Sequence, residues 1–369
     1  MSSPRVAVFS FADIDNYGDI LFSWVVRSEL RKRRPDVITD FYAPTDCWIE
    51  GEYYHGYTRD RIDGQYDALI LAGGEVVHFF DQRTWEPIYQ RRELSVLSER
   101  ASDVVWDWAS CRAKLKAWLS VGVRPFEDEH NPAKVESVLH NLDFISTRGI
   151  LSKKILEGGA WSAYEPRIQV TPDLGWLFPR LAEEVDIDET EFKSRLVKDG
   201  DYAVFQFHNI TKAEAGEIAR VLKRFKMETG INVVLLPVIH LWNDREPMQW
   251  IVEASGGDLL MPSGKQGPFE IANIVMGAEL VLSSSLHVAI TALAAGIPAG
   301  IFNKWPGTKF QDLMGLQMRS QHFIRNIDHI PYAIEALLKE RAQPQRLITY
   351  SKFMTSTLDE VFDGIVVKL

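Results

Sequence analysis

Short apolar runs rich in β-forming residues alternate with amphipathic helical patterns along the whole sequence, and this alternation limits the fold more than any other feature. The first such runs cover residues 6–9, 38–42 and 68–72, and a later strand is expected at 259–261. Alternation of this kind is the signature of strand–helix–strand units, in which a helix connects two parallel strands. The sequence therefore predicts an α/β protein built on parallel sheets.

The chain is long enough for two such domains. It has 369 residues, of which 46% are hydrophobic and 25% charged, an ordinary globular composition. A charged, acidic stretch near residues 180–200 separates two series of strands. We expect an N-terminal Rossmann-like domain over 1–180 and a C-terminal one over 181–343. A final helix is expected over 344–369, and its packing against the N-terminal domain stays open.

Local signals predict where several helices begin. Asp19 or Asn16 is placed to cap a helix that ends before Pro35, and Ser152 to cap another helix that stops near Gly158. Thr211 and Glu214 have the spacing of a capping box.

Charge and cysteine content exclude several classes of function. The formal net charge of −10 opposes binding to nucleic-acid backbones or anionic lipid surfaces. Cys47 and Cys111 form no metal-binding pair, and two distant cysteines are typical of a reducing compartment, so we expect a cytoplasmic protein. The uncharged segment 280–303 could span a bilayer by length, but Gly296 and Pro298 interrupt it, and no transmembrane segment is expected.

The first candidate motif directly follows the first strand. Asp15, Asn16, Gly18 and Asp19 open the next helix, whose N-terminal N–H groups suit an anion or a polar substrate group. A plain turn with a helix cap explains the same residues. Asp13 and Asp15 also form a D-x-D, which is too short a pattern to predict a metal site.

A second motif, Gly73-Gly74-Glu75, follows the buried strand at 68–72. Paired glycines allow a ligand or another backbone to approach closely. The spacing is not that of a dinucleotide-binding loop. Glu75 could act as an acid or base, and a structural turn is the alternative.

Further polar residues follow later strands. Arg148 ends a strand and could hold a phosphate or carboxylate, or could form a surface ion pair. Asp173 could cap a helix or orient a neighbour. His208 and His240 each follow a strand in the second half, where a structural role is the alternative.

The segment with the strongest signal is Ser283-Ser284-Ser285-Leu286-His287. A strand ends in small hydroxyl residues, and a helix begins with His287 in its first turn, which together suit a phosphate. His287 could donate to an anion or transfer a proton near neutral pH. Lys304 and Lys309 follow the next strand and could neutralise charge. A buried helix with a polar start is the alternative.

These motifs occur in the same order as in a known family, which the chain resembles: the polysaccharide pyruvyl transferases. The matching residues are Asn16-Tyr17-Gly18-Asp19 (N-x-G-D), Tyr66-Asp67 through Gly73-Gly74, Ile145-Ser146-Thr147-Arg148 with Ser152 and Leu156, Pro172-Asp173, and Ser285-Leu286-His287 through Gly296-Ile297-Pro298 with Lys304 or Lys309. The resemblance covers most of the chain.

The resemblance implies a pair of Rossmann-like domains of the glycosyltransferase-B (GT-B) type. It also implies transfer of the enolpyruvyl group of phosphoenolpyruvate to two hydroxyls of a sugar, which forms a pyruvate ketal and releases phosphate. The sequence departs from the family pattern twice: Ser285 stands where the family has arginine, and Gly149 where it has aspartate. Losing a guanidinium that grips an anionic donor would cost a few kcal/mol.

We therefore expect a transferase with its site in the cleft between two domains, taking a small-molecule donor and a saccharide acceptor, with no cofactor or metal. His287 and Arg148 are the predicted catalytic residues. The predicted donor-binding residues are Ser283, Ser284, Ser285, Leu286, His208, His240, Lys304 and Lys309. The predicted acceptor-binding residues are Asp15, Asn16, Gly18, Asp19, Gly73, Gly74 and Glu75.

Several alternatives stay open. A glycosyltransferase that uses a nucleotide-sugar donor would fit the same architecture, and Ser285 favours it. An inactive homologue that binds glycan is the third reading. The sequence does not determine the oligomeric state, nor whether the protein contacts a membrane to reach a lipid-linked acceptor.

Overall fold

The computed structural model describes residues 3–78, 101–125, 132–158, 167–185, 197, 200–240, 243–305, 307–317 and 322–369. The chain divides into two compact units. Unit 1 comprises Met1–Leu174, Gln311–Leu316 and Thr355–Leu369, and unit 2 comprises Gly175–Phe310 and Gln317–Met354. The division after Leu174 lies slightly before the predicted boundary at residue 180, and most of the acidic stretch lies outside the described residues. Each unit is described by itself.

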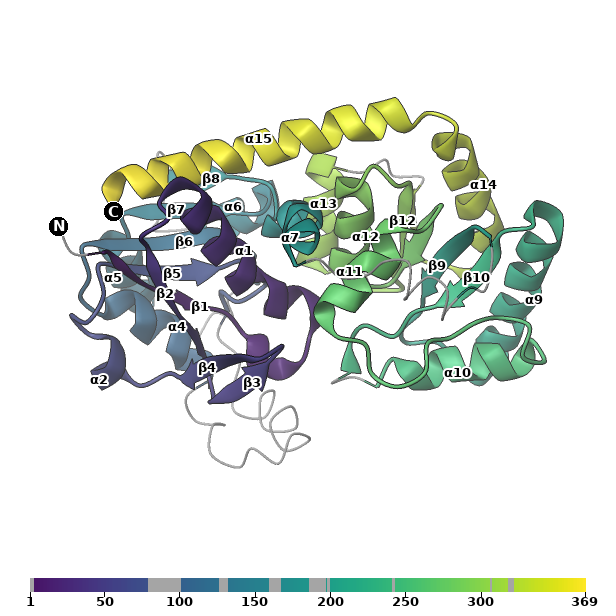
Figure 1. Cartoon of the computed structure of the whole chain (residues 1–369), viewed down its shortest axis with the longest axis horizontal. Helices are drawn as coiled ribbons and strands as arrows, with labels where there is room; N and C mark the ends of the chain where they lie inside the picture. The colour runs from purple at the N-terminus through teal and green to yellow at the C-terminus, as the bar shows by residue number, and fades with distance from the viewer. Residues whose placement is uncertain are drawn as a thin grey trace. The chain divides into compact units, whose positions relative to one another are not determined.

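Unit 1 contains an eight-stranded sheet in the order β3-β4-β2-β1-β5-β6-β7-β8 (Figure 1). Its strands are β1 (Arg5–Phe9), β2 (Ile38–Ala43), β3 (Cys47–Ile49), β4 (Glu52–Gly56), β5 (Ala68–Ala72), β6 (Leu115–Val121), β7 (Phe144–Thr147) and β8 (Ile168–Val170). Neighbouring strands are parallel, except that β3 and β4 pair antiparallel at one edge.

The hydrophobic pattern explains this sheet. Every residue of β5 is buried, as expected for a central strand covered by helices on both faces. The helices of unit 1 are α1 (Tyr17–Arg33), α2 (Arg59–Ile62), α4 (Ala101–Ser110), α5 (Pro132–Asn141) and α6 (Ile150–Glu157), with the short 3-10 helix η1 (Ala12–Ile14) before α1. As predicted, α1 ends before Pro35, which cannot continue a helix.

Unit 2 contains a parallel five-stranded sheet in the order β10-β9-β11-β12-β13. Its strands are β9 (Tyr202–Gln206), β10 (Asn232–Leu235), β11 (Val281–Ser283), β12 (Ala299–Phe302) and β13 (Phe323–Ile324). Its helices include α7 (Phe178–Glu184), α9 (Lys212–Thr229), α10 (Arg245–Ala254), α11 (Pro268–Met276), α12 (Leu286–Ala294) and α14 (Ile330–Arg341), while α13 (Thr308–Gln317) and α15 (Pro344–Lys368) have residues in both units. The prediction of a parallel α/β protein is confirmed.

Two local predictions have different outcomes in unit 2. The capping box of α9 is confirmed, because Thr211 Oγ1 accepts from the Glu214 N–H and Glu214 Oε2 accepts from the Thr211 N–H. The expected strand at 259–261 is reduced to a single bridge between Leu260 and Val234.

The C-terminal end of α15 packs within unit 1. Arg33 of α1 donates from Nη2 to Asp359 at 2.8 Å and from Nε to Asp363 at 2.6 Å. The Arg33 guanidinium also binds Glu29 one turn earlier in α1, at 2.6 Å. None of the helices in the described part of the chain combines the length and hydrophobicity needed to cross a bilayer.

Candidate functional site

Because parallel strands end at one edge of a sheet, the loops after β1, β5, β6 and β7 share one edge of unit 1. After β1, Asp15 takes a left-handed backbone conformation and Asn16 occupies the N-cap position of α1. Asn16 Nδ2 donates to Asp19 Oδ2 at 2.8 Å. Of the two residues predicted to cap this helix, Asn16 is at the N-cap position, whereas Asp19 lies within the first turn of α1, which begins at Tyr17.

The two glycines after β5 contact the start of α1. Gly73 and Gly74 both have positive φ angles, of 55° and 78°. A Cβ atom on Gly73 would lie 2.8 Å from the Phe22 ring, and one on Gly74 would lie 2.9 Å from Asp19 Oδ1. Only glycine fits both the backbone angle and the space. The structure thus brings together two motifs that lie more than fifty residues apart.

Arg148 is buried at the end of β7, with 3% of its surface exposed. Its Nη1 donates to Asp173 Oδ2 at 3.3 Å, and its Nη2 lies 3.9 Å from Glu75 Oε1. Arg124 donates to the other Glu75 oxygen at 2.7 Å. No described residue accepts a hydrogen bond from Arg148 Nε or Nη2. Arg148 is therefore a buried guanidinium and not the surface ion pair that was the alternative, and its Nε and Nη2 have no acceptor among the described residues.

The guanidinium fits here because of Gly122, which sequence reasoning did not single out. A Cβ at residue 122 would lie 2.7 Å from Arg148 Nε. The backbone irregularity just before it, where the β6–β7 register shifts and Ser120 has a φ of 51°, brings Gly122 to this position. A glycine directly after an apolar strand was the available sequence signal.

The start of α6 differs from the prediction, because Gly149, not Ser152, is its N-cap residue. Asp312, from a segment of unit 1 far along the chain, supplies the capping carboxylate. Its Oδ1 accepts from the Leu151 N–H at 2.7 Å, and its Oδ2 accepts from Ser152 Oγ at 2.6 Å. A Cβ on Gly149 would overlap the Asp312 carboxyl group. No local pattern could have revealed a cap separated by 160 residues.

In unit 2, the loops after β9 and β11 form a second group of polar residues. Ser283 Oγ donates to Gln206 Oε1 at 2.9 Å, and Ser284 Oγ accepts from the His208 N–H at 3.1 Å. The Ser284 N–H donates to the Gln206 carbonyl at 2.9 Å, and the Ser285 N–H donates to Ser283 Oγ at 2.9 Å. The sequence predicts that the Ser284 and Ser285 backbone cradles a phosphate, but both N–H groups already donate within the fold.

The first turn of α12 is another source of backbone donors in the described part of unit 2. The helix begins at Leu286, and its N-cap residue Ser285 makes no side-chain capping hydrogen bond. The N–H groups of a first helical turn have no acceptor within the helix. His287 lies in this turn, 8% exposed, with its ring 6.3 Å from that of Phe178. The prediction that a helix starts here with His287 in its first turn is confirmed.

The other predicted donor-binding residues have varied surroundings. Burial lowers the pKa of His208, Asp244 opposes this shift and Lys309 adds to it. Lys304 donates to Glu214 at 2.7 Å, so its ammonium is already paired with the capping box of α9. The Lys309 ammonium lies 5.0 Å from the ring centre of Phe310. His240 is half-buried after β10.

Asp244 organises this group although the sequence did not single it out. It is fully buried, and its Oδ2 accepts from Gln206 Nε2 at 3.1 Å and from the Val238 and Ile239 N–H groups at 2.8 and 3.0 Å. Searching the described residues for three or more metal-ligating side chains close together gives no such group.

Tyr66 and Asp67 of the family-like pattern lie at the opposite end of β5 from the glycines. Asp67 accepts from the Arg5 N–H at 2.9 Å and from Lys114 at 2.7 Å, which lowers the pKa of its carboxyl group. These residues join strand starts and lie away from the polar loops.

Comparison with known sequences identifies the family. The profile of the polysaccharide pyruvyl transferases matches residues 16–303, which is more than three quarters of the chain and includes both polar groups. The chain belongs to the polysaccharide pyruvyl transferase family. A search of curated proteins gave no significant match. Membership assigns the chain to a family of transferases.

Solved structures of low sequence identity share the fold. A UDP-GlcNAc 2-epimerase from Methanocaldococcus jannaschii has a TM-score of 0.58 at 13% identity, over 94% of this chain and 99% of that one. The UDP-GlcNAc-bound enzyme from Neisseria meningitidis has a TM-score of 0.57 at 11% identity, covering 96% and 99%. S. aureus MnaA with UDP has a TM-score of 0.55 at 12% identity, covering 96% and 91%. Together with the two sheets, these likenesses show a GT-B-like fold.

Proposed function

We propose that this pyruvyl transferase family member moves the enolpyruvyl group of phosphoenolpyruvate onto a sugar diol of a glycan or glycolipid intermediate. Family membership over residues 16–303 is the observation that supports this most directly. Each unit also offers hydrogen-bond donors suited to an anion: the first turn of α12 in unit 2, and the unused Arg148 nitrogens in unit 1. Phosphoenolpyruvate carries a phosphate and a carboxylate, and each of these donor groups suits an anion of either kind.

In the proposed reaction, a general acid protonates the methylene carbon of phosphoenolpyruvate and leaves a cation at the neighbouring carbon. One acceptor hydroxyl attacks that carbon and loses its proton, phosphate then departs, and the second hydroxyl closes the ketal as it loses its own proton. The products are a pyruvate ketal and inorganic phosphate. No oxidant or reductant is needed, and cationic side chains and helix N-termini can stabilise the charges that develop.

The proposed roles follow from the chemistry of each side chain. His287 protonates carbon or donates to the phosphate, because an imidazolium N–H can act as a general acid and as a hydrogen-bond donor. Arg148 holds the carboxylate or phosphate. Since Asp173 and Glu75 balance its charge, Arg148 would orient that anion through Nε and Nη2 rather than attract it by net charge. Asp15 and Asn16 would hold the acceptor.

Ser285 favours a second candidate, a glycosyltransferase with a nucleotide-sugar donor. A serine before Leu286-His287 provides no guanidinium for a small trianionic donor. Structures of similar fold are described as bound to UDP or UDP-GlcNAc. An inactive glycan-binding homologue is a third candidate. Both cysteines are free, which fits a reducing cytoplasm. There the enzyme would meet exopolysaccharide precursors, including lipid-linked ones at the membrane surface.

One assay separates these candidates. The protein is incubated with a panel of saccharide acceptors and either phosphoenolpyruvate or nucleotide-sugars. Acceptor-dependent phosphate release that requires phosphoenolpyruvate supports our proposal. Release of a nucleoside phosphate supports the glycosyltransferase, and release of neither product supports the inactive homologue. Thermal shift with each donor alone gives a second readout, because a ligand of the folded state raises its melting temperature.

His287→Ala tests the role assignment, with the exposed His329→Ala as its matched control in the same unit. We expect His287→Ala to lower turnover about 100-fold or more, in the range for loss of a general acid. The turnover of His329→Ala should equal that of the wild type. Full turnover by His287→Ala would show that another group supplies the proton.

A further inference from the structure

A row of aromatic rings crosses the edge of the sheet in unit 1 and changes from buried to exposed. Successive ring centres are 5.3 Å apart for Tyr42 and His55, 4.8 Å for His55 and Tyr53, and 5.1 Å for Tyr53 and Trp48. Tyr42 is 3% exposed, Tyr53 36% and Trp48 72%. The row therefore begins in the core and ends as an open aromatic surface.

The strand register places these rings on one face. His55 pairs with Tyr42, and Trp48 pairs with Tyr53, so the four side chains project to the same side of β2, β4 and β3. The inner end of the row is covered by α4, where Trp108 lies 5.7 Å from Tyr42. None of the described helices covers the outer end, where Trp48 is largely exposed.

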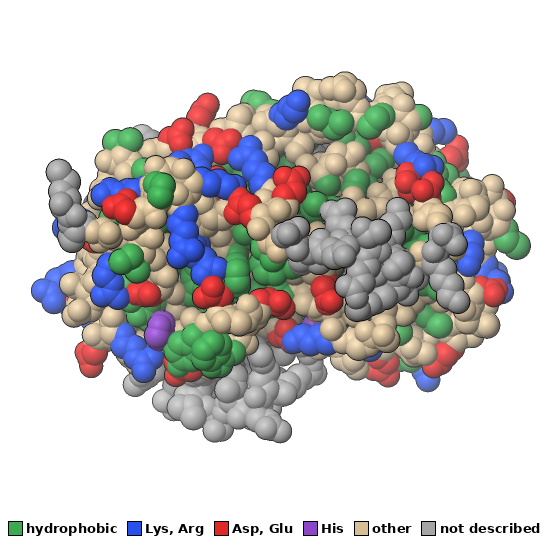
Figure 2. All heavy atoms as spheres, in the orientation of Figure 1, with side chains coloured by type: hydrophobic (Ala, Val, Ile, Leu, Met, Phe, Trp, Pro, Cys, Tyr) green, Lys and Arg blue, Asp and Glu red, His purple; other side chains and the backbone are tan. Residues whose placement is uncertain are grey.

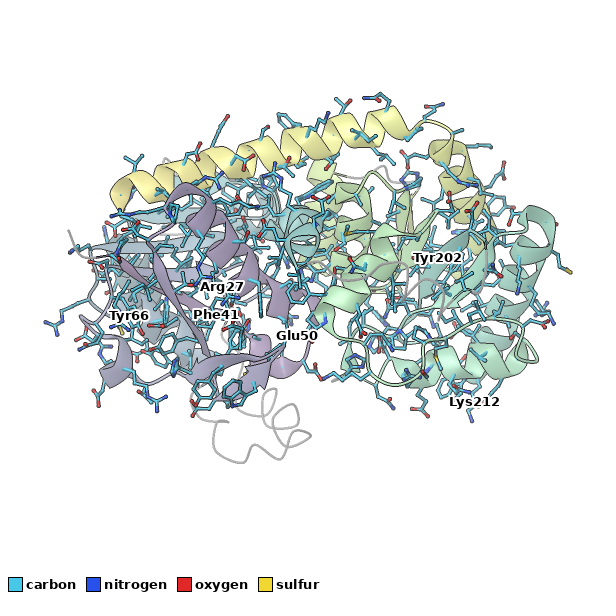
Figure 3. All side chains as sticks on the ribbon, viewed as in Figure 1. Arg27, Phe41, Glu50, Tyr66, Tyr202 and Lys212 are labelled. Atoms are coloured by element: carbon cyan, nitrogen blue, oxygen red, sulfur yellow. The ribbon has the colours of Figure 1, made fainter. Side chains whose placement is uncertain are left out.

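The opposite face of the same strands is packed. Phe41 pairs with Tyr54, which is fully buried, and the Arg27 guanidinium of α1 lies 4.5 Å from the Phe41 ring centre (Figure 3). Core packing accounts for Phe41 and Tyr54 on that face. It does not account for Trp48, since an exposed indole gains little stability from the fold.

Polar groups border the exposed rings. Asp46 Oδ1 accepts from the Tyr53 hydroxyl at 2.6 Å and from the Gly56 N–H at 2.8 Å, while Asp46 Oδ2 makes no hydrogen bond to a described residue. Those bonds hold the pKa of Asp46 below its usual range. The Arg61 guanidinium lies 3.4 Å from Asp46 Oδ1 and is half exposed. Figure 2 shows hydrophobic side chains gathered over the β3–β4 hairpin, with charged side chains and a histidine beside them.

The hairpin is joined to the candidate acceptor loop. Asp13 is fully buried, and its Oδ2 accepts from Thr45 Oγ1 at 2.6 Å and from the Thr45 N–H at 3.1 Å. Thr45 directly precedes Asp46, and Asp13 lies two residues before Asp15. One buried carboxylate thus fixes the aromatic row relative to the loop in which we propose that the acceptor binds.

We propose that Trp48 and Tyr53, with Asp46 and Arg61 at their border, form a saccharide-binding subsite for the glycan that carries the acceptor diol. The C–H face of a pyranose ring stacks on an aromatic ring, and its hydroxyls bind carboxylate and guanidinium groups. Exposed aromatic surface with a polar rim is typical of such recognition sites. This inference rests on the proposed function for its choice of a saccharide over a protein partner.

The test measures saccharide binding to the full chain by calorimetry and saturation-transfer NMR. The ligands are defined saccharides of one to five residues, built from glucose, galactose, mannose or N-acetylmannosamine. We expect at least one oligosaccharide to bind more tightly than its monosaccharides, and Trp48→Ala to weaken it about tenfold. Trp48→Phe should retain most of the affinity. Trp305→Ala is the matched control, because Trp305 is 73% exposed in unit 2.

Further outcomes separate this inference from the proposed function. With an active acceptor, Trp48→Ala should raise KM for the glycan while leaving kcat and KM for phosphoenolpyruvate unchanged. If phosphoenolpyruvate proves inactive but Trp48-dependent glycan binding persists, the subsite stands and the donor assignment falls. Equal glycan binding by Trp48→Ala and Trp305→Ala, no binding of any saccharide by the wild type, or dissociation of a dimer by Trp48→Ala in sedimentation would each overturn the inference.

Discussion

Two substitutions can move the carboxylate that caps α6 from position 312 to position 149. This exchange is the sharpest test of the capping contact. Asp312 caps the helix from a distant segment, and Gly149 leaves the space that its carboxyl group fills. The variant Gly149→Asp/Asp312→Gly places the carboxylate on the N-cap residue itself. Aspartate is a favoured N-cap residue, and the extended backbone at position 149 accepts any side chain.

Each single substitution should destabilise unit 1. Asp312→Gly removes a buried charged cap, at a cost of about 2–3 kcal/mol, and adds about 1 kcal/mol for glycine inside α13. Gly149→Asp forces a Cβ into the Asp312 carboxyl group and brings two carboxylates together, at a cost of about 1–3 kcal/mol. Additive effects would total about 4–7 kcal/mol.

The double variant should lose only about 1–2 kcal/mol, because the cap is restored and the overlap is gone. The coupling free energy is therefore at least about 2 kcal/mol, or about 4 °C or more in melting temperature for a unit of this size. Urea unfolding and calorimetry of the four proteins measure it. Gln311→Gly, at an exposed position of the same helix, controls for the cost of glycine.

A second control tests whether steric overlap between positions 149 and 312 contributes to the effect. The Asp312 Cβ also lies in the space that a Cβ on residue 149 would need, so Gly149→Asp/Asp312→Ala should not be rescued. Additivity of Gly149→Asp and Asp312→Gly would refute the reasoning, since it would mean that the two positions do not share one capping site.

Two further predictions concern unit 1. Burial, with a smaller effect of Arg124, lowers the pKa of His78 to about 3, so the unfolded chain binds a proton at this residue well before the folded chain does. The free energy of unfolding should therefore fall as the pH drops below about 6.5, by up to about 1.4 kcal/mol per pH unit. His78→Gln should flatten the change in urea midpoint between pH 7 and 5. The same pH dependence in wild type and variant would contradict the role of His78. Arg33→Met removes the contacts with Asp359 and Asp363 and should speed hydrogen exchange in the last turns of α15. Arg31→Met, at an exposed position of α1, is the control and should not change that exchange. Equal exchange in both variants would show that these ion pairs do not hold the end of α15.

The sequence by itself determined the fold class and the position of the polar loops. Alternating periodicity predicts strand–helix–strand units, and polar residues placed directly after buried strands must gather at one edge of a parallel sheet. This is why Asp19, Gly74, Glu75 and Arg148 could be chosen as neighbours before their contacts were known. Short-range signals succeeded where their partners were close in sequence, as in the capping box of Thr211 and Glu214.

Only the tertiary structure decided which donors are already used and which partners come from far along the chain. No local sequence pattern indicates that the Ser284 and Ser285 N–H groups donate within the fold, that Lys304 pairs with Glu214, or that Asp312 replaces a cap at residue 149. Hydrogen bonds and steric overlap act over a few ångströms, whereas local sequence patterns report only on residues within a few positions. Contacts that join residues 160 positions apart depend on how the whole chain folds.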